Sequence, residues 1–358
     1  MDKKLEFLKE LTDANGIPGN EGAVRKVFKK MVTEVADEVT QDKLGSVIAK
    51  KIGHVGGPKI AIAGHLDEVG FIVHYIDDSG FIKFKPVGGW WSQVLLSQLM
   101  TVTTSTGATY HGIIGSTPPH VLTPEQRKKV AELDSMFIDF GVDSKEEAEA
   151  LGIKPGDMIT PYMEFKTLAN PKYMLAKAWD NRFGCALVID VLNNLKEQSH
   201  PNEYFAIATV QEEVGLRGAT TVGNMINPDI VIGADVVLDG TVPGAEKIKT
   251  KMGKGPCIML MDAGTIGHKA LREYVMALAE ELEIPIQLDV LMGGGTDAGT
   301  MHKSHDGAPA ISFGVATRYI HSNGSIMHRD DYDNAVKLMT EFVKRFDSDA
   351  LNSVVYAD

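Results

Sequence analysis

Residues 204–215 read YFAIATVQEEVG, a run of aromatic, aliphatic and β-branched residues that ends in two adjacent carboxylates. Such a run predicts a buried strand, which Gly215 and Gly218 are expected to end. Adjacent side chains on a strand point to opposite faces, so Glu212 and Glu213 can share a site only where the strand breaks into a turn. An enzyme that holds a metal ion and moves a proton needs one carboxylate for each task.

Helical and strand-like segments alternate on both sides of this stretch. Apolar residues at helical spacing predict helices over 5–11, 24–35, 185–195, 271–282 and 336–346. Short apolar runs predict buried strands at 46–50, 59–63, 173–176, 230–234 and 309–315. This alternation predicts an α/β fold built around an open sheet.

Residues 71–165 have a different texture. Short strands are predicted at 71–75, 81–84 and 100–104, with Asp, Ser and Gly turns between them, which indicates a small β-barrel or sandwich. One helix is expected from Thr123 to about Leu133, because TPEQ at 123–126 has capping-box spacing with proline at the first helical position. We therefore expect 71–165 to be an insertion into an α/β domain formed by 1–70 and 166–358.

Composition excludes several classes of partner. The chain has 358 residues, with 36 Lys and Arg against 48 Asp and Glu, and its net charge of -12 argues against binding to nucleic acid. No segment approaches the roughly 20 apolar residues that span a bilayer, and the N-terminus lacks the apolar core of a signal peptide. The only cysteines, Cys185 and Cys257, indicate neither a disulfide framework nor a cysteine metal site, and favour a reducing cytoplasm.

Residue types that bind metal ions recur at the ends of the predicted strands. They are His65, Asp180, Glu212, Glu213, Asp235 and His321. Ligands of an open α/β sheet bind beyond the carboxyl ends of its strands, so these distant residues are expected to converge. Two imidazoles and three or four carboxylates suit zinc, cobalt or manganese, and they are too many for one tetrahedral ion. A pair of metal ions that share one bridging carboxylate fits the count better.

Each of these residues also has a plainer interpretation. Asp180 could be the N-cap of the following helix, Asp235 could cap a turn, and a single histidine is more often a surface or core residue than a ligand. Asp67, two positions after His65, could fix the tautomer of that imidazole or be an ordinary surface acid. The glycine-rich segment 293–299 lacks the spacing of a phosphate loop, and a tight turn lining the site is favoured.

Five short motifs carry a resemblance to a known family. They are AGHLDEVG at 63–70, AWDNR at 178–182, QEEVG at 211–215, GAD at 233–235 and RYIHS at 318–322. In this order they resemble the motifs of the M42 family of dinuclear metallo-aminopeptidases, which includes glutamyl, leucyl and deblocking aminopeptidases. The resemblance covers nearly the whole chain, and no ligand position departs from the pattern.

The resemblance implies a two-metal site with zinc, cobalt or manganese. It implies two ligand sets that share the bridging Asp180: Glu213 with His321, and His65 with Asp235. It further implies that Glu212 is the general base, that Asp67 orients His65, and that the peptide bond after Asp180 is cis.

The same resemblance implies the architecture and the assembly. The catalytic domain is expected to be a mixed-sheet α/β/α metallopeptidase domain, and the insertion a PDZ-like dimerisation domain. Dimers of this family commonly assemble into a tetrahedral dodecamer. The expected substrates are short peptides, whose N-terminal peptide bond is hydrolysed by a water molecule activated by two metal ions and Glu212.

Other functions compete with this one. A di-metal carboxypeptidase or deacylase could use similar ligands on a related fold. A glycoside hydrolase could use the carboxylates, although it would need two carboxyl groups about 5–9.5 Å apart and would leave the histidines without a role. A non-catalytic scaffold is a third alternative. Within the aminopeptidase hypothesis, Arg318 could meet an acidic substrate side chain or be held in a structural ion pair, and neutral substrates are the default.

Overall fold

Four parallel strands form the centre of an eleven-stranded mixed sheet in the computed structural model, which describes residues 3–291 and 293–355. In spatial order they are β12 (Glu203–Thr209), β3 (Lys59–His65), β13 (Ile230–Leu238) and β16 (Ala310–Arg318). Almost all of their residues are buried, as is typical of parallel strands covered on both faces. Their carboxyl ends therefore meet along one edge of the sheet.

Seven further strands extend the sheet, mostly by antiparallel pairing. They are β1 (Glu38–Gln41), β2 (Val47–Ile52), β10 (Lys166–Thr167), β11 (Tyr173–Ala176), β14 (Cys257–Met261), β15 (Gln287–Val290) and β17 (Ser325–His328). The predicted α/β fold is confirmed, and its sheet is mixed.

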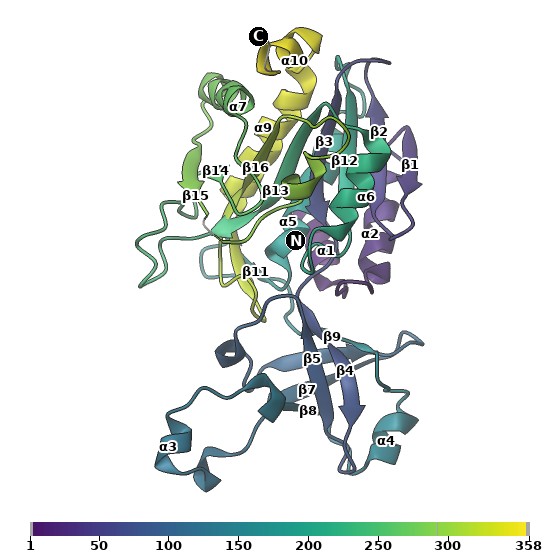
Figure 1. Ribbon diagram of the computed structural model, residues 1–358, viewed down its shortest axis with the longest axis vertical. Coiled ribbons are helices and arrows are strands. Elements are labelled where there is room, and N and C mark those ends of the chain that lie inside the picture. The colour runs from purple at the N-terminus through teal and green to yellow at the C-terminus, as the bar shows by residue number, and fades with distance from the viewer. Residues whose placement is uncertain (1–2, 292, 356–358) are drawn as a thin grey trace.

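Helices pack against both faces of the sheet (Figure 1). One face carries α1 (Lys3–Asp13), α2 (Gly22–Val32), α5 (Trp179–Asn194), α7 (Lys269–Glu281) and α9 (Arg329–Arg345), with α10 (Ser348–Val354) after α9. The other carries α6 (Arg217–Ile226) and α8 (Ala298–Met301). Side chains of β3 alternate between the two cores, Ile60 and Ile62 in the first and Ala61 and Ala63 in the second. Within the described ranges, no helix has the length and apolar character that spanning a membrane requires.

Helix α5 approaches β3 so closely that only glycine fits at the contact. A Cβ atom on Gly64 would lie 2.5 Å from the carbonyl carbon of Gly184, and one on Gly184 would lie 2.3 Å from the carbonyl oxygen of Ala234. This contact fixes the first turn of α5, which carries Asp180, next to the carboxyl ends of β3 and β13.

Gly64→Ala is expected to destabilise the protein by about 1–3 kcal/mol, the usual cost of forcing an extra methyl group into a packed core. The free energy of unfolding from denaturant titration measures it. Gly22→Ala is the control, because no described atom lies within 4 Å of a Cβ atom built at Gly22. The free energy of unfolding of this variant should hardly change. Equal stability of the two variants would show that α5 and β3 can separate freely.

The inserted segment forms a closed six-stranded barrel below the sheet domain in Figure 1. Its strands, in the order in which they pair, are β4 (Gly70–Ile76), β5 (Ile82–Val87), β8 (Phe137–Asp139), β7 (Thr109–Gly115), β6 (Leu99–Thr103) and β9 (Met158–Pro161). The barrel has a hydrophobic core of its own, around Phe71, Ile82 and Ile138. The predicted β-rich unit is thus a barrel rather than a sandwich.

Short helices and turns decorate the barrel. They are α3 (Pro124–Arg127), α4 (Lys145–Ala150) and the 3-10 turns Ser92–Val94, Pro119–Val121 and Leu133–Ser135. The predicted capping box is present, because Thr123 and Gln126 exchange side chain to backbone hydrogen bonds of 3.2 and 2.9 Å. The predicted helix to Leu133 is wrong, since α3 ends at Arg127. All of its residues are exposed, so no buried face stabilises further turns.

Candidate active site

Two parallel strands end side by side at the site. His65 is the last residue of β3, and the parallel register places it opposite Thr209, the last residue of β12. The backbone N–H of Leu66 donates to the carbonyl of Thr209 at 2.8 Å, so the two chains leave the sheet together. The imidazole of His65 is buried.

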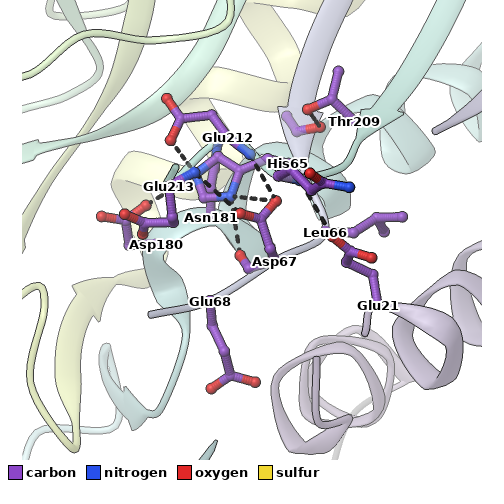
Figure 2. Close-up of polar contacts among 12 residues, drawn as sticks. Glu21, His65, Leu66, Asp67, Glu68, Asp180, Asn181, Thr209, Glu212 and Glu213 are labelled. Carbon is purple, nitrogen blue, oxygen red and sulfur yellow. Dashed lines mark hydrogen bonds and ion pairs between the residues drawn. The ribbon is translucent and has the colours of Figure 1, made fainter. Parts of the chain in front are cut away.

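The turn after β12 directs both adjacent glutamates to one place. Gln211 has a left-handed backbone with φ of 57°, and Gly215 follows with φ of 118°, so the strand is already broken before Glu212. The side chain of Glu21, just before α2, accepts a hydrogen bond from the N–H of Gln211 at 3.2 Å and anchors this turn. The side chains of Glu212 and Glu213 consequently both join the cluster around His65 and Asp180 (Figure 2).

Asp67 holds this turn in place. Its carboxylate accepts hydrogen bonds from the backbone N–H groups of Glu212 at 3.1 Å and Glu213 at 3.0 Å. The close contact to Nδ1 of His65 comes from the Asp67 carbonyl oxygen, at 2.9 Å, whereas its carboxylate lies 3.6 Å away. An Nδ1–H that donates to this carbonyl leaves Nε2 of His65 free to bind a metal ion.

Asp180 is turned into the site by an irregular first turn of α5. Asp180 and Asn181 have non-helical dihedral angles, and the peptide bond between them is cis. The side-chain amide of Asn181 pairs with two backbone groups. It donates a hydrogen bond to the Ala234 carbonyl and accepts one from the Gly184 N–H, both at 2.8 Å. Asp180 is therefore not needed as a helix cap. Its Oδ1 lies 3.2 Å from Nε2 of His65, and its Oδ2 lies 3.2 Å from Nε2 of His321.

Asp235 and His321 approach from the next two strands. The expectation that Asp235 follows the end of a strand is wrong, because β13 continues to Leu238. The carboxylate of Asp235 is 3.8 Å from Nε2 of His65.

His321 lies three residues beyond β16. Its Nδ1 contacts the carbonyl oxygen of Gly89, in the loop after β5, at 3.0 Å. The barrel side of the molecule thus orients one of the two histidines.

The structure brings the five predicted metal ligands together in two groups that share one residue. One group is His65, Asp180 and Asp235, and the other is Asp180, Glu213 and His321, with the ligand atoms of each group within 4.8 Å of one another. Glu212 belongs to neither group, although its Oε2 lies 3.8 Å from Nε2 of His65.

The donor set fits divalent cations. Imidazole nitrogens and carboxylate oxygens are the ligands of zinc, cobalt and manganese. Oε1 of Glu213 is buried and has no hydrogen-bond partner among the described residues, an unfavourable state that a cation would relieve.

Burial and mutual repulsion shift the protonation of these groups. Burial and the Asp180 carboxylate raise the pKa of Glu213 to about 8. Burial also raises the pKa of Glu212 and Asp235 well above the usual range. Burial would lower the pKa of His321, but the neighbouring Asp180 and Glu213 carboxylates raise it to about 9. Without cations the site holds protons, which metal binding has to displace.

A buried carboxylate that the motifs do not single out lies under the site. Asp297 is 2% exposed and accepts a hydrogen bond from Oγ1 of Thr209 at 2.7 Å. Burial raises the pKa of Asp297 to about 6. Its only sequence signal is its place two positions after the glycines 293–295, which line the adjacent cavity as the predicted tight turn should.

Glu68 serves the scaffold rather than the site. Figure 2 shows its side chain pointing away from the cluster of carboxylates. Its Oε1 forms a buried ion pair with Lys177 at 2.5 Å and lies 3.2 Å from Arg182. Arg182 also donates to the carbonyl of Leu66 at 3.0 Å, so this network fixes the segment that follows His65.

A cavity of about 470 Å³ opens beside the two ligand groups. Its apolar walls come from Leu216, Val236, Leu238, Leu291 and Ile320. No Lys or Arg side chain lines it within the part of the chain that the structure describes.

Arg318 is held in a structural ion pair. Its Nε lies 2.6 Å from the buried Asp239, and its guanidinium also donates to Thr241 at 2.7 Å. The guanidinium is therefore already neutralised, and the arrangement gives no support to an acidic substrate side chain at Arg318.

An α/β sheet that gathers histidine and carboxylate side chains into two candidate metal-binding groups at one edge is the arrangement expected of a metal-dependent enzyme. The chain belongs to the M42 peptidase family, since residues 45–338 match the family described as M42 glutamyl aminopeptidase. It is similar to glutamyl aminopeptidase of Lactococcus lactis, with 31% identity over 98% of each chain. The chain is accordingly an aminopeptidase, which confirms the predicted activity.

Solved structures agree with this assignment. The fold is similar to that of a TET aminopeptidase from a marine sediment thaumarchaeon, with a TM-score of 0.96 and 42% identity over 99% of this chain and 100% of the other. It is also similar to the TET1 peptidase of Pyrococcus horikoshii, with a TM-score of 0.85 and 32% identity over 95% and 99% of the two chains.

Proposed function

We propose that the chain uses two divalent metal ions, zinc, cobalt or manganese, to remove N-terminal residues from short peptides. The observation that carries this proposal is the position of Asp180, which directs one carboxylate oxygen toward His65 and the other toward His321. Asp180 would bridge the two ions. His65 and Asp235 would complete one set of ligands, and Glu213 and His321 the other.

When bound, such ions would polarise the carbonyl of the scissile bond and lower the pKa of a water molecule. Glu212 is the group that moves the proton. It lies at the edge of the ligand cluster but outside both groups, and Asp67 fixes its backbone. Its Oε2 accepts the proton of the attacking water and returns it to the departing amine. Asp67 thereby positions Glu212 and Glu213 as well as His65.

The carboxylates also explain why a chain end would be selected. Glu212 lies outside both ligand groups, so a bound cation does not use its carboxylate, which can attract an N-terminal ammonium group in the cavity; a blocked N-terminus carries no charge. A panel of peptides with free and acetylated N-termini tests this. Only the free peptides should be cleaved, and cleavage should stop when a chelator removes the metal ions.

A neutral, apolar N-terminal residue is expected to be the best substrate. With leucine, lysine and glutamate p-nitroanilides, kcat/KM for the leucine compound should be at least about tenfold higher, because the cavity walls would desolvate a charged side chain without pairing it. The rates are measured after saturation with zinc, cobalt or manganese. Equal or faster hydrolysis of the glutamate compound would contradict this assignment of the cavity.

The inserted segment is proposed to mediate assembly. We propose that 71–165 is a PDZ-like dimerisation domain inserted into an α/β/α domain formed by 1–70 and 166–358. Residues 1–2, 292 and 356–358 of that domain are outside the part of the chain that the structure describes. The related TET1 peptidase is described as able to assemble into a tetrahedron or a large octahedral shell. Exposed apolar side chains on the barrel side, Leu96, Leu99 and Ile113, are suited to contacts between copies.

Light scattering during gel filtration tests the assembly. We expect the molar mass of twelve chains, built from dimers, and a monomer at micromolar concentration would contradict the proposal.

A cytoplasmic location is proposed on the basis of the two free, buried cysteines.

A further inference from the structure

A second cavity, of about 900 Å³, lies where the loop after β5 meets the loop after β16. It is lined by Trp90, Trp91, Gln93, Gln98, Met163 and the segment 319–324. Ile320 and His321 line this cavity and also the smaller one beside the metal ligands. The two cavities therefore adjoin at the loop that carries His321.

The two cavities differ sharply in charge. The smaller one contains the carboxylates of Asp180, Glu212, Glu213 and Asp235. Within residues 3–291 and 293–355, no Asp, Glu, Lys or Arg lines the larger one. Bound cations would offset the charge of the carboxylates, so the size of the cavities decides the orientation of a peptide. The cavity of about 470 Å³ suits the single residue that is removed, and the cavity of about 900 Å³ suits the remainder of the peptide.

The walls of the larger cavity are suited to an extended, uncharged peptide. Trp91 is 61% exposed and Tyr319 is 53% exposed, so both rings offer uncovered apolar surface. Tyr319 has a left-handed backbone with φ of 62°, a conformation uncommon for a bulky residue outside functional segments. The side-chain amides of Gln93 and Gln98 line the cavity and can donate to and accept from peptide groups.

We propose that this cavity binds the part of the substrate that follows the cleaved bond, with an apolar or aromatic substrate side chain packed against Trp91 and Tyr319. The inference rests on the proposed function, since it assigns the second half of the same peptide. Its volume lies in the range of sites that bind small ligands. Peptides with an apolar second residue should thus be preferred to those with an acidic one.

Leucinamide and the amides of Leu-Phe-Ala and Leu-Asp-Ala test this proposal. Leucinamide has no side chain beyond the cleaved bond, so it does not reach the larger cavity. For the wild-type enzyme we expect kcat/KM on Leu-Phe-Ala amide to exceed that on leucinamide and on Leu-Asp-Ala amide by at least about tenfold. In Trp91→Ala the ratio of Leu-Phe-Ala amide to leucinamide should fall at least about fivefold, mainly through KM, and Trp91→Phe should restore most of it.

Val121→Ala is the matched control, because Val121 is also on the barrel side, is 74% exposed and does not line the cavity. It should keep the wild-type ratio. If Trp91→Ala leaves the ratio of kcat/KM for Leu-Phe-Ala amide to that for leucinamide unchanged, the inference is overturned. If this variant instead changes the molar mass of the protein without changing that ratio, the cavity is a contact between copies, and the inference is likewise overturned. Failure of the wild-type protein to cleave any of the three compounds would overturn the proposed function and the inference with it.

Discussion

Glu212→Gln is expected to lower kcat by about 10²–10⁴-fold, the range that general acid–base catalysis contributes. Glutamine has nearly the same shape as glutamate but cannot accept the proton of the attacking water. Because Glu212 lies outside both ligand groups, the variant should bind as many metal ions as the wild-type protein. Kinetics with leucine p-nitroanilide, together with metal analysis of the same sample, measure both effects.

Glu273→Gln is the control, because Glu273 is exposed on α7 and belongs to neither ligand group. This variant should keep full activity and full metal content. Near wild-type turnover in Glu212→Gln would remove Glu212 from the mechanism. Loss of metal ions from this variant would instead identify Glu212 as a ligand.

Asp180→Asn is expected to have the opposite profile, losing metal ions first and activity as a consequence. Asp180 is the only residue that the two ligand groups share, so the change weakens both. Removing an outer partner of a ligand already costs 10–100-fold in metal affinity, and loss of a shared ligand should cost at least about 100-fold. Metal content per chain after dialysis and the apparent dissociation constant of each ion are the measurements.

Asp190→Asn provides a control on the same helix. Asp190 lies toward the other end of α5, where its carboxylate accepts a hydrogen bond from Tyr332 at 2.8 Å. Its variant should keep both metal ions. Equal metal affinity in the Asp180 and Asp190 variants would contradict a bridging role for Asp180.

The central strands could be predicted because local sequence determines them. The run at 204–210 and the run at 59–63 are apolar without interruption, which only strands buried on both faces tolerate, and they form β12 and β3. Strands β14 and β15 were not predicted. The sequence of β15, QLDV, has no buried residue and carries only a weak apolar pattern, whereas β14, CIMLM, is apolar throughout and was missed although its first three residues are buried.

The ligands could be predicted because their residue types recur beside apolar runs, and Asp67 could be predicted from its place two positions after His65, but other residues that hold the ligands in place could not. Glu21 anchors the turn at Gln211 across 190 positions of sequence, and Asp297 meets Thr209 across 88. Such pairs exist only in the folded chain, and a lone buried acid has no local signature. The contact between Gly89 and His321 is equally invisible, since it uses a backbone carbonyl.

Local patterns misled where tertiary structure decides. A capping box started α3 as predicted, yet without a buried face the helix stopped after one turn. Asp235 was expected beyond a strand because a charged residue usually ends a buried run. The strand continues through it, since its carboxylate faces His65 and the other ligands instead of apolar side chains.

Anomalous diffraction from crystals grown with zinc or cobalt shows directly whether these residues form a two-metal catalytic centre. We expect two anomalous peaks per chain, one among His65, Asp180 and Asp235 and one among Asp180, Glu213 and His321. A single peak, or peaks away from Asp180 in an enzyme that is active, would contradict this expectation.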